Sequence, residues 1–213
     1  MAEKRGLFVS VEGIEGVGKS TVIAYIKKQL DQLDLEYTLT REPGGTPIAE
    51  DVRAVLLKHH EETMAADTEL LLMFAGRAQN IQSIIKPALE KGVWVLSDRF
   101  TDASFAYQGG GRGVAMQHIE ELESWVQGDL KPDAILLLDT EVDVGLARVQ
   151  SRGAKDRIEQ EGVDFFERAR DVYLQRAAAD PDRYIIVDAT RPADEVCTVA
   201  WSRIKALYEA WNA

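Results

Sequence analysis

Short apolar runs alternate with longer amphipathic segments along most of the chain. The runs have the length and the β-branched content of strands, and residues 134–139 (AILLLD) are apolar up to the terminal aspartate. A continuous apolar run of this kind suits a strand buried on both faces of a sheet. The expected strands are residues 7–11, 36–40, 93–96, 134–139 and 184–188.

Between these runs, apolar residues recur at intervals of three and four, which is the helical period. In the segment after the first run, Val22, Ile26 and Leu30 fall on one side of a helix. Pro87 is expected to kink or restart the long helix that contains it, because proline removes a backbone donor. The expected helices are residues 21–33, 47–58, 67–91, 116–127, 142–151, 164–179 and 193–211.

The alternation of strand and helix predicts an α/β fold with a parallel sheet covered by helices on both faces. A chain of 213 residues fits one globular domain over residues 1–213. Residues 109–113 (GGGRG) are predicted to form a loop, either near a ligand or as a flexible connection. Residues 152–159 are charged and poor in core side chains, so we expect them to be mobile and exposed.

The junction between the first strand and the first helix matches the pattern G-x-x-x-x-G-K-[ST]. Such a P-loop binds phosphate because glycines let successive backbone N–H groups converge on the oxyanions, at the positive end of the following helix. Lys19 is expected to reach the β- and γ-phosphates and Ser20 the Mg²⁺ ion. The predicted ATP-binding residues are Gly13, Ile14, Glu15, Gly16, Val17, Gly18, Lys19, Ser20 and Thr21.

Composition and charge limit the kinds of partner and the cellular compartment expected for the protein. The formal net charge is −11, which argues against a surface for nucleic acid, because backbone phosphates are bound by clustered Lys and Arg. The single cysteine, Cys197, excludes an internal disulfide and is compatible with a reducing compartment. No apolar run approaches the length that spans a membrane, so we expect a cytoplasmic protein that does not enter membranes.

Three of the expected strands end in or next to an acidic residue, namely Glu12, Asp98 and Asp139. Ligands of open α/β sheets bind beyond the carboxyl ends of strands, so these side chains are expected to line one crevice with the P-loop. Each acid has the alternative of serving as a helix cap or turn residue, and for Asp139 the two readings stay open. Asp98 is the better candidate for the Mg²⁺ side.

Arginines follow the second and third strands at turns and on the next helices. Arg41, Arg53, Arg77, Arg99 and Arg112 lie far apart in sequence but are expected around one cleft, where guanidinium forks bind phosphate. Some of the five are expected to be ordinary solvated side chains. The others indicate a second anionic substrate.

Motifs that the sequence lacks argue against other classes of protein. The sequence holds no D-x-x-G and no N-K-x-D, which disfavours a GTPase-type switch, and it has no G-x-S-x-G. The three histidines lack the spacing of a metal site.

Several motifs, taken in order, resemble those of the bacterial thymidylate kinase family. They are the P-loop, TREPGGT at 40–46, FAGR at 74–77, DRF at 98–100, AYQGGGRG at 106–113 and DRIE at 156–159. The resemblance implies a P-loop NTPase fold with a five-stranded parallel sheet, similar to nucleoside monophosphate kinases, with a short lid at about residues 150–160. It also implies a cytosolic homodimer that transfers the ATP γ-phosphate to dTMP with Mg²⁺.

The resemblance implies roles for individual residues of the dTMP site. Arg53 and Arg99 resemble clamps on the dTMP phosphate, Arg77 is directed at the base, and Phe74 resembles a ring that stacks on thymine. Simple helix core is the alternative for Phe74. The remaining implied contacts are Ser104 to the base, Tyr107 and Gln108 near the deoxyribose and base, and Glu15 to the sugar 3′-hydroxyl.

Members of the family differ in where the catalytic arginine lies. This chain has Glu15 and Val17 in the P-loop and Arg152 in the expected lid, so it resembles the lid-arginine type. Catalysis is then expected from Lys19, Arg99, Arg152 and Mg²⁺, by positioning and charge stabilisation. The alternatives are a P-loop kinase for another nucleotide or nucleoside, and a nucleotide-binding module without activity.

Overall fold

The computed structural model describes residues 4–150 and 156–213. Its centre is a five-stranded sheet in the order β2-β3-β1-β4-β5, and every neighbouring pair of strands is parallel. The predicted parallel sheet is therefore confirmed, and its five strands agree with the resemblance. The strands are β1 (Phe8–Glu12), β2 (Tyr37–Arg41), β3 (Trp94–Asp98), β4 (Ala134–Asp139) and β5 (Tyr184–Asp188).

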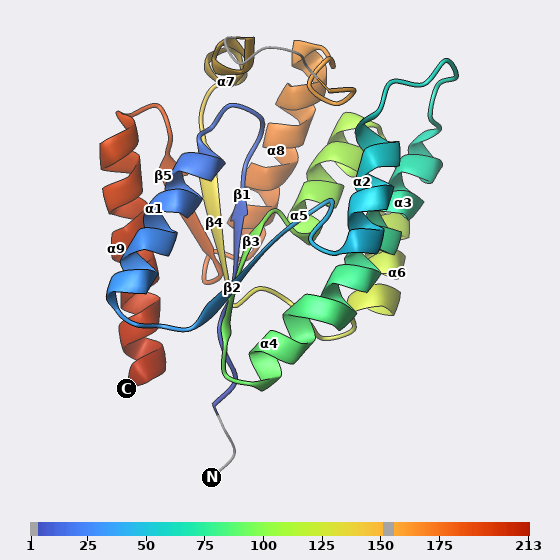
Figure 1. The fold of residues 1–213 in the computed structure, drawn as a ribbon. Helices are drawn as coiled ribbons and strands as arrows, with labels where there is room; N and C mark the ends of the chain where they lie inside the picture. Colours follow the sequence, from blue (N-terminus) through green and yellow to red (C-terminus); the bar gives the residue numbers. More distant parts are fainter. Residues whose placement is uncertain (1–3, 151–155) are drawn as a thin grey trace.

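Helices connect successive strands and cover both faces of the sheet, with α1 and α9 together on one side (Figure 1). Strand β4 is buried at every position before Asp139, as its continuous apolar run predicted. The helices are α1 (Lys19–Gln32), α2 (Pro47–Leu57), α3 (Ala66–Asn80), α4 (Lys86–Glu90), α5 (Thr101–Ser104), α6 (Met116–Gln127), α7 (Val142–Gln150), α8 (Val163–Ala179) and α9 (Ala193–Asn212). Two π-helical segments, η1 (Ile81–Ile85) and η2 (Phe105–Gly111), continue α3 and α5.

The long helix expected over residues 67–91 is divided near its proline. Helix α3 runs into η1, and α4 begins at Lys86 with Pro87 in its first turn. Pro87 falls where the π-helical bonding of η1, in which the N–H of Lys86 bonds to the carbonyl oxygen of Ile81, gives way to α4, and proline brings no N–H that needs a partner. The sequence-based prediction of a restart at Pro87 is confirmed.

Hydrogen bonds between neighbouring residues hold the turn after β2 in place. Gly45 has a φ of 94°, which suits glycine, and its N–H donates to Glu50 Oε1 at 2.8 Å. Thr46 then caps α2, because its Oγ accepts the N–H of Ala49 at 3.2 Å. Pro47 occupies the first turn. This fixed corner presents the carboxyl end of β2 toward the P-loop.

The prediction of a loop at residues 109–113 was wrong over most of its length. The glycines lie in η2, where they allow close packing against α8: a Cβ on Gly110 would lie 2.6 Å from the carbonyl oxygen of Arg168. The Arg168 guanidinium also donates to the carbonyl oxygens of Gly110 and Gly111, at 3.0 and 2.8 Å. These glycines therefore serve close approach rather than flexibility.

Residues 152–159, which were predicted to be mobile and exposed, lie only partly within the described residues. Residues 151–155, with Arg152, lie outside the described residues. Residues 156–159 are half-buried rather than exposed, so the prediction of exposure was wrong for them. Arg157 explains the difference, because its Nε donates to the carbonyl oxygen of Leu56 at 2.8 Å and its NH2 lies 2.7 Å from Glu69.

Within the described ranges, the helices are too short or too polar to cross a membrane.

Candidate active site

The P-loop connects the carboxyl end of β1 to α1 through glycines in left-handed conformations. Gly16 has a φ of 76° and Gly18, at the N-terminus of α1, a φ of 95°. Close packing also requires Gly16, because a Cβ there would lie 1.9 Å from the carbonyl oxygen of Gly145 in α7. Lys19 folds back over the loop and donates to the carbonyl oxygens of Gly13 and Ile14 at 3.0 and 2.9 Å. The loop thus places one ammonium beside the N-terminus of α1, where anions bind.

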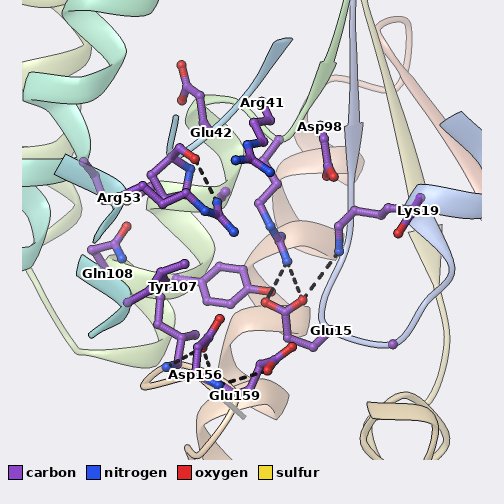
Figure 2. Close-up of a pocket in the computed structure, with 18 of the residues that line it drawn as sticks. Glu15, Lys19, Arg41, Glu42, Arg53, Asp98, Tyr107, Gln108, Asp156 and Glu159 are labelled. Carbon is purple, nitrogen blue, oxygen red and sulfur yellow. Dashed lines mark hydrogen bonds and ion pairs between the residues drawn. The ribbon is translucent and has the colours of Figure 1, made fainter. Parts of the chain in front are cut away.

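A pocket of about 210 Å³ opens beside the P-loop at the carboxyl ends of β2 and β3. Figure 2 shows side chains from distant parts of the chain converging on it. Predicted site residues that line it are Glu15, Gly16, Gly18, Lys19, Ser20, Arg53, Asp98, Arg99, Tyr107 and Gln108. Of the five arginines expected around one cleft, Arg41, Arg53 and Arg99 line this pocket, whereas Arg77 and Arg112 do not.

Arg99 organises the charge in this pocket. Its NH2 lies 2.8 Å from both carboxylate oxygens of Glu15, and its NH1 donates to the carbonyl oxygen of Gly13 at 2.8 Å. The guanidinium carbon lies 4.8 Å from the centre of the Tyr107 ring. Contacts from both terminal nitrogens, together with the stacking on Tyr107, hold the Arg99 guanidinium in one orientation at the mouth of the P-loop.

The charges shift the pKa values of the neighbouring groups. Burial acts to raise the pKa of Glu15, but the positive charges of Arg99 and Lys19 outweigh it and lower that pKa below its usual value. Burial, together with the charge of Arg99, lowers the pKa of Lys19 to about 8. The charged groups that line the pocket therefore shift one another's pKa values.

Beneath the pocket lies a buried carboxylate, Glu12 at the end of β1. Its Oε1 accepts the N–H of Phe100 at 2.6 Å, and its Oε2 accepts the hydroxyl of Tyr173 at 2.9 Å. Burial first, and then the charge of Asp102, raise the pKa of Glu12 to about 8. The Tyr173 hydroxyl also accepts from Arg99 NH1 at 3.2 Å, so Glu12 supports the pocket from below.

The three acids at strand ends therefore have different positions. Asp98 lines the pocket, Glu12 is 0% exposed, and Asp139 forms an ion pair with Arg170 at 2.8 Å. The expectation that all three line one crevice was wrong for Glu12 and Asp139, which do not border this pocket. Asp139 instead forms a structural ion pair with Arg170.

Three residues implied for the base site lie in a buried cluster behind the pocket. Arg77 is 0% exposed; its Nε donates to Glu42 Oε2 at 2.7 Å and its NH2 to Ser104 Oγ at 3.0 Å. Its guanidinium carbon lies 4.5 Å from the centre of the Phe74 ring, which is 2% exposed. Phe74, Arg77 and Ser104 do not border the pocket, so their contacts with a base stay predictions. Arg77 NH1 is buried without a hydrogen-bond partner in the described chain.

Asp98 and Ser20 were the candidates for the metal side of the site. Both line the pocket, and Asp98 Oδ1 is buried without a hydrogen-bond partner among the described residues. An unpartnered carboxylate oxygen and a hydroxyl that border the same pocket suit a hard cation that takes its other ligands from phosphates and water. The described chain contains no cluster of three or more side chains that could hold a metal by themselves.

A second cavity, of about 540 Å³, lies on the other side of the P-loop. It shares Gly16 and Gly18 with the first, but its walls come from α7, the turn after β5 and the start of α9. The P-loop prediction covered Gly16, Val17, Gly18 and Thr21 here, but sequence reasoning missed Arg148, Thr190 and Arg191. The available signal was the turn ATRP that follows Asp188 at the carboxyl end of a predicted strand.

The comparisons with known proteins agree with this geometry. The family model named Thymidylate kinase matches residues 11–199. The thymidylate kinase of Pseudomonas fluorescens (strain Pf-5) is 56% identical over 191 residues, which is 90% of this chain and 91% of the relative. That of Ectopseudomonas mendocina (strain ymp) is 52% identical over 205 residues, covering 96% of this chain and 98% of the relative. From its P-loop to the start of α9, this chain belongs to the thymidylate kinase family.

Proposed function

We propose that the protein is an ATP-dependent dTMP kinase, which transfers the γ-phosphoryl group of ATP to dTMP and releases dTDP and ADP. The observation that carries this proposal is the pair of cavities that meet at Gly16 and Gly18. One lies over β2 and β3, the other over β4 and β5, and β1 with its P-loop stands between them in the sheet. Two nucleotides bound in these cavities would direct their phosphates at one another.

The donor is assigned to the larger cavity, because the P-loop holds the donor phosphates and its backbone closes that cavity. Arg148 borders it and donates to the carbonyl oxygen of Ala189 at 3.1 Å. The acceptor is assigned to the smaller pocket, where Arg41, Arg53 and Arg99 gather around one space. Three guanidinium groups in one pocket suit a second phosphate group rather than a neutral nucleoside.

In the proposed reaction, a phosphate oxygen of dTMP attacks the γ-phosphorus, and the bond between that phosphorus and the bridging oxygen of ADP breaks. The acceptor phosphate is mostly dianionic at neutral pH, because its second pKa is about 6, so it needs no base. Lys19 and Arg99 stabilise the charge on the transferring group. Mg²⁺, held by Ser20 and Asp98, would neutralise the charge of the β- and γ-phosphate oxygens. Arg152 is proposed as a further stabilising charge from the resemblance alone.

The test is an ADP-release assay with ATP and Mg²⁺ over dTMP, dUMP, CMP, UMP, AMP and thymidine. The proposal predicts turnover with dTMP far above turnover with the ribonucleotides and thymidine. Preference for another acceptor would favour a different P-loop kinase. Binding of ATP without turnover on any acceptor would favour a nucleotide-binding module.

We also propose a cytoplasmic homodimer that pairs through α3 and α6. Trp125 on α6 is 82% exposed and Leu71 on α3 is 56% exposed, and both border one hollow on this face. Large apolar side chains gathered at one place on the surface favour a protein contact. Light scattering after gel filtration tests the dimer: Trp125→Glu should yield monomers, whereas Val199→Glu on α9 should not. A monomeric wild type would overturn the proposal.

A further inference from the structure

Glu69 is a buried carboxylate on α3 that joins two motifs of the sequence to the wall of the smaller pocket. Its side chain is 1% exposed. One of its partners, Arg112, belongs to the glycine-rich motif at residues 106–113, and another, Arg157, to residues 156–159. Arg112 Nε lies 3.1 Å from Glu69 Oε2, and Arg157 NH2 lies 2.7 Å from the same oxygen.

The third partner of Glu69 lines the pocket itself. Gln108 Nε2 donates to Glu69 Oε1 at 2.8 Å, and Figure 2 shows Gln108 at the edge of the pocket. An ionised carboxylate can only accept hydrogen bonds, so the amide of Gln108 must present its NH₂ group to Glu69. Burial acts to raise the pKa of Glu69, but the hydrogen bond from Gln108 and the charges of Arg112 and Arg157 outweigh it and lower that pKa. The orientation of the amide is therefore fixed at neutral pH.

The fixed amide leaves one acceptor without a partner. Gln108 Oε1 is buried, and it has no hydrogen-bond partner in the part of the chain that the structure describes. A buried acceptor in a pocket wall gains most from a ligand that brings an N–H group, and it disfavours a ligand that brings a lone pair. Thymine and uracil carry N–H at the ring position where cytosine carries an unprotonated nitrogen.

We propose that Glu69 is a specificity-positioning residue, which holds the Gln108 amide with its oxygen as an acceptor and so favours pyrimidines with a ring N–H over cytosine. The inference rests on the proposed function, because it takes the smaller pocket as the acceptor site. Glu69 acts through Gln108 and does not itself border the pocket. Through Arg157 it also anchors residues 156–159, which form another wall of that pocket.

The chain offers a matched control in Glu161. This carboxylate is also an ion-pair partner of Arg112, at 2.5 Å, but its side chain is 30% exposed and it accepts a hydrogen bond from Arg112 rather than from Gln108. Glu69→Gln removes the charge and lets the amide of Gln108 turn over. Glu69→Asp keeps the charge near both arginines but withdraws the carboxylate from Gln108. Glu161→Gln removes the negative charge of Glu161, which pairs with Arg112 and does not contact Gln108.

The experiment is calorimetric titration of dTMP, dUMP and dCMP into each full-length variant, with thermal unfolding as the check of folding. Wild type should bind dTMP and dUMP more tightly than dCMP. Both Glu69 variants should reduce the preference for dTMP over dCMP by about tenfold or more, since an unpaired buried group is what rejects the wrong ligand. They should leave the ratio of dTMP to dUMP within about twofold, within the usual scatter for substitutions away from a contact. Glu161→Gln should leave both ratios unchanged.

The inference is overturned if a folded Glu69 variant keeps the wild-type preference, if Glu161→Gln lowers it equally, or if wild type does not discriminate against dCMP. Should neither Glu69 variant fold, Gln108→Leu decides, because it leaves Glu69 with both arginines: an unchanged preference rejects the inference and a lost one supports it. Failure of the proposed function is recognised separately. Wild type would then discriminate in binding as described but transfer no phosphoryl group to dTMP.

Discussion

Arg99 and Glu15 form an ion pair across the mouth of the P-loop, with both carboxylate oxygens 2.8 Å from one guanidinium nitrogen, NH2. Arg99 is proposed to bind the phosphate of dTMP, and Glu15 resembles the acid that contacts the sugar 3′-hydroxyl. The ion pair places these two side chains next to one another. A phosphate entering the pocket would compete with Glu15 for the guanidinium fork. If dTMP binds as proposed, Glu15 holds Arg99 in position until the acceptor phosphate replaces it.

Arg99→Lys is expected to lower kcat/KM for dTMP by about tenfold or more, although the charge is retained. A lysine cannot reproduce the planar fork that binds phosphate and carboxylate through two parallel hydrogen bonds. Steady-state kinetics with dTMP varied at saturating ATP measure the effect. Arg170→Lys is the matched control, because Arg170 also pairs with both oxygens of a carboxylate, Asp139, but does so outside the pocket, through Nε and NH2. Equal losses in both variants would mean that the Arg99 effect is structural.

Lys19→Ala is expected to lower kcat by about 10²- to 10³-fold, which is the usual effect of losing one preorganised donor to a developing oxyanion. The carbonyl oxygens of Gly13 and Ile14 hold the ammonium within the P-loop, and the proposed mechanism has it contact the β- and γ-phosphates. Lys27→Ala, on the exposed side of α1, serves as the control. Unchanged turnover in Lys19→Ala would remove the P-loop lysine from the mechanism.

The fold followed from the sequence because periodicity reports burial directly. The strand at residues 134–139 was predicted with its observed bounds, since a parallel strand buried on both faces has no polar positions to confuse the pattern. The P-loop was predicted because its chemistry requires particular residues at fixed spacing. Both features depend on local sequence alone.

Other features depend on contacts between distant residues, which no local pattern reveals. Gly110 resembles a loop residue in sequence, but its lack of a Cβ serves packing against α8. Glu69 has no motif of its own, and its importance appears only where Gln108 and Arg157 meet it. The turn at Thr190 was missed because the second cavity forms between segments far apart in the chain.

Phe74→Leu is expected to separate base stacking from packing. Phe74 is 2% exposed, so alanine there would cost about 3–5 kcal/mol of stability and obscure any effect on binding. Leucine keeps most of the volume but removes the aromatic ring. If ligand binding brings the ring against thymine, KM for dTMP should rise by roughly 5- to 160-fold, equivalent to 1–3 kcal/mol of stacking, with KM for ATP unchanged. An unchanged KM for dTMP in a stable variant would identify Phe74 as core.

Glu12→Gln is expected to change how stability depends on pH. Burial and the charge of Asp102 raise the pKa of Glu12 to about 8 from its ordinary 4.5, so the folded protein binds this proton more tightly than the unfolded chain does. The stability that the protonated carboxyl contributes is present in full below about pH 4.5, and it is lost as the pH rises toward 8. The slope from this single group is at most about 1.4 kcal/mol per pH unit.

Glutamine cannot titrate, so the stability of Glu12→Gln relative to wild type should increase steadily between pH 5 and pH 8. Urea unfolding of both proteins across that range measures the difference, and Glu120→Gln, at an exposed position on α6, is the control for a general charge effect. A constant difference between wild type and Glu12→Gln would show that Glu12 is ionised throughout, with the hydrogen bonds from Phe100 and Tyr173 and the charge of Arg99 compensating its burial. In that case the support beneath Arg99 carries a permanent negative charge. A changing difference means instead that protonation of Glu12 tunes the charge beneath the pocket at neutral pH.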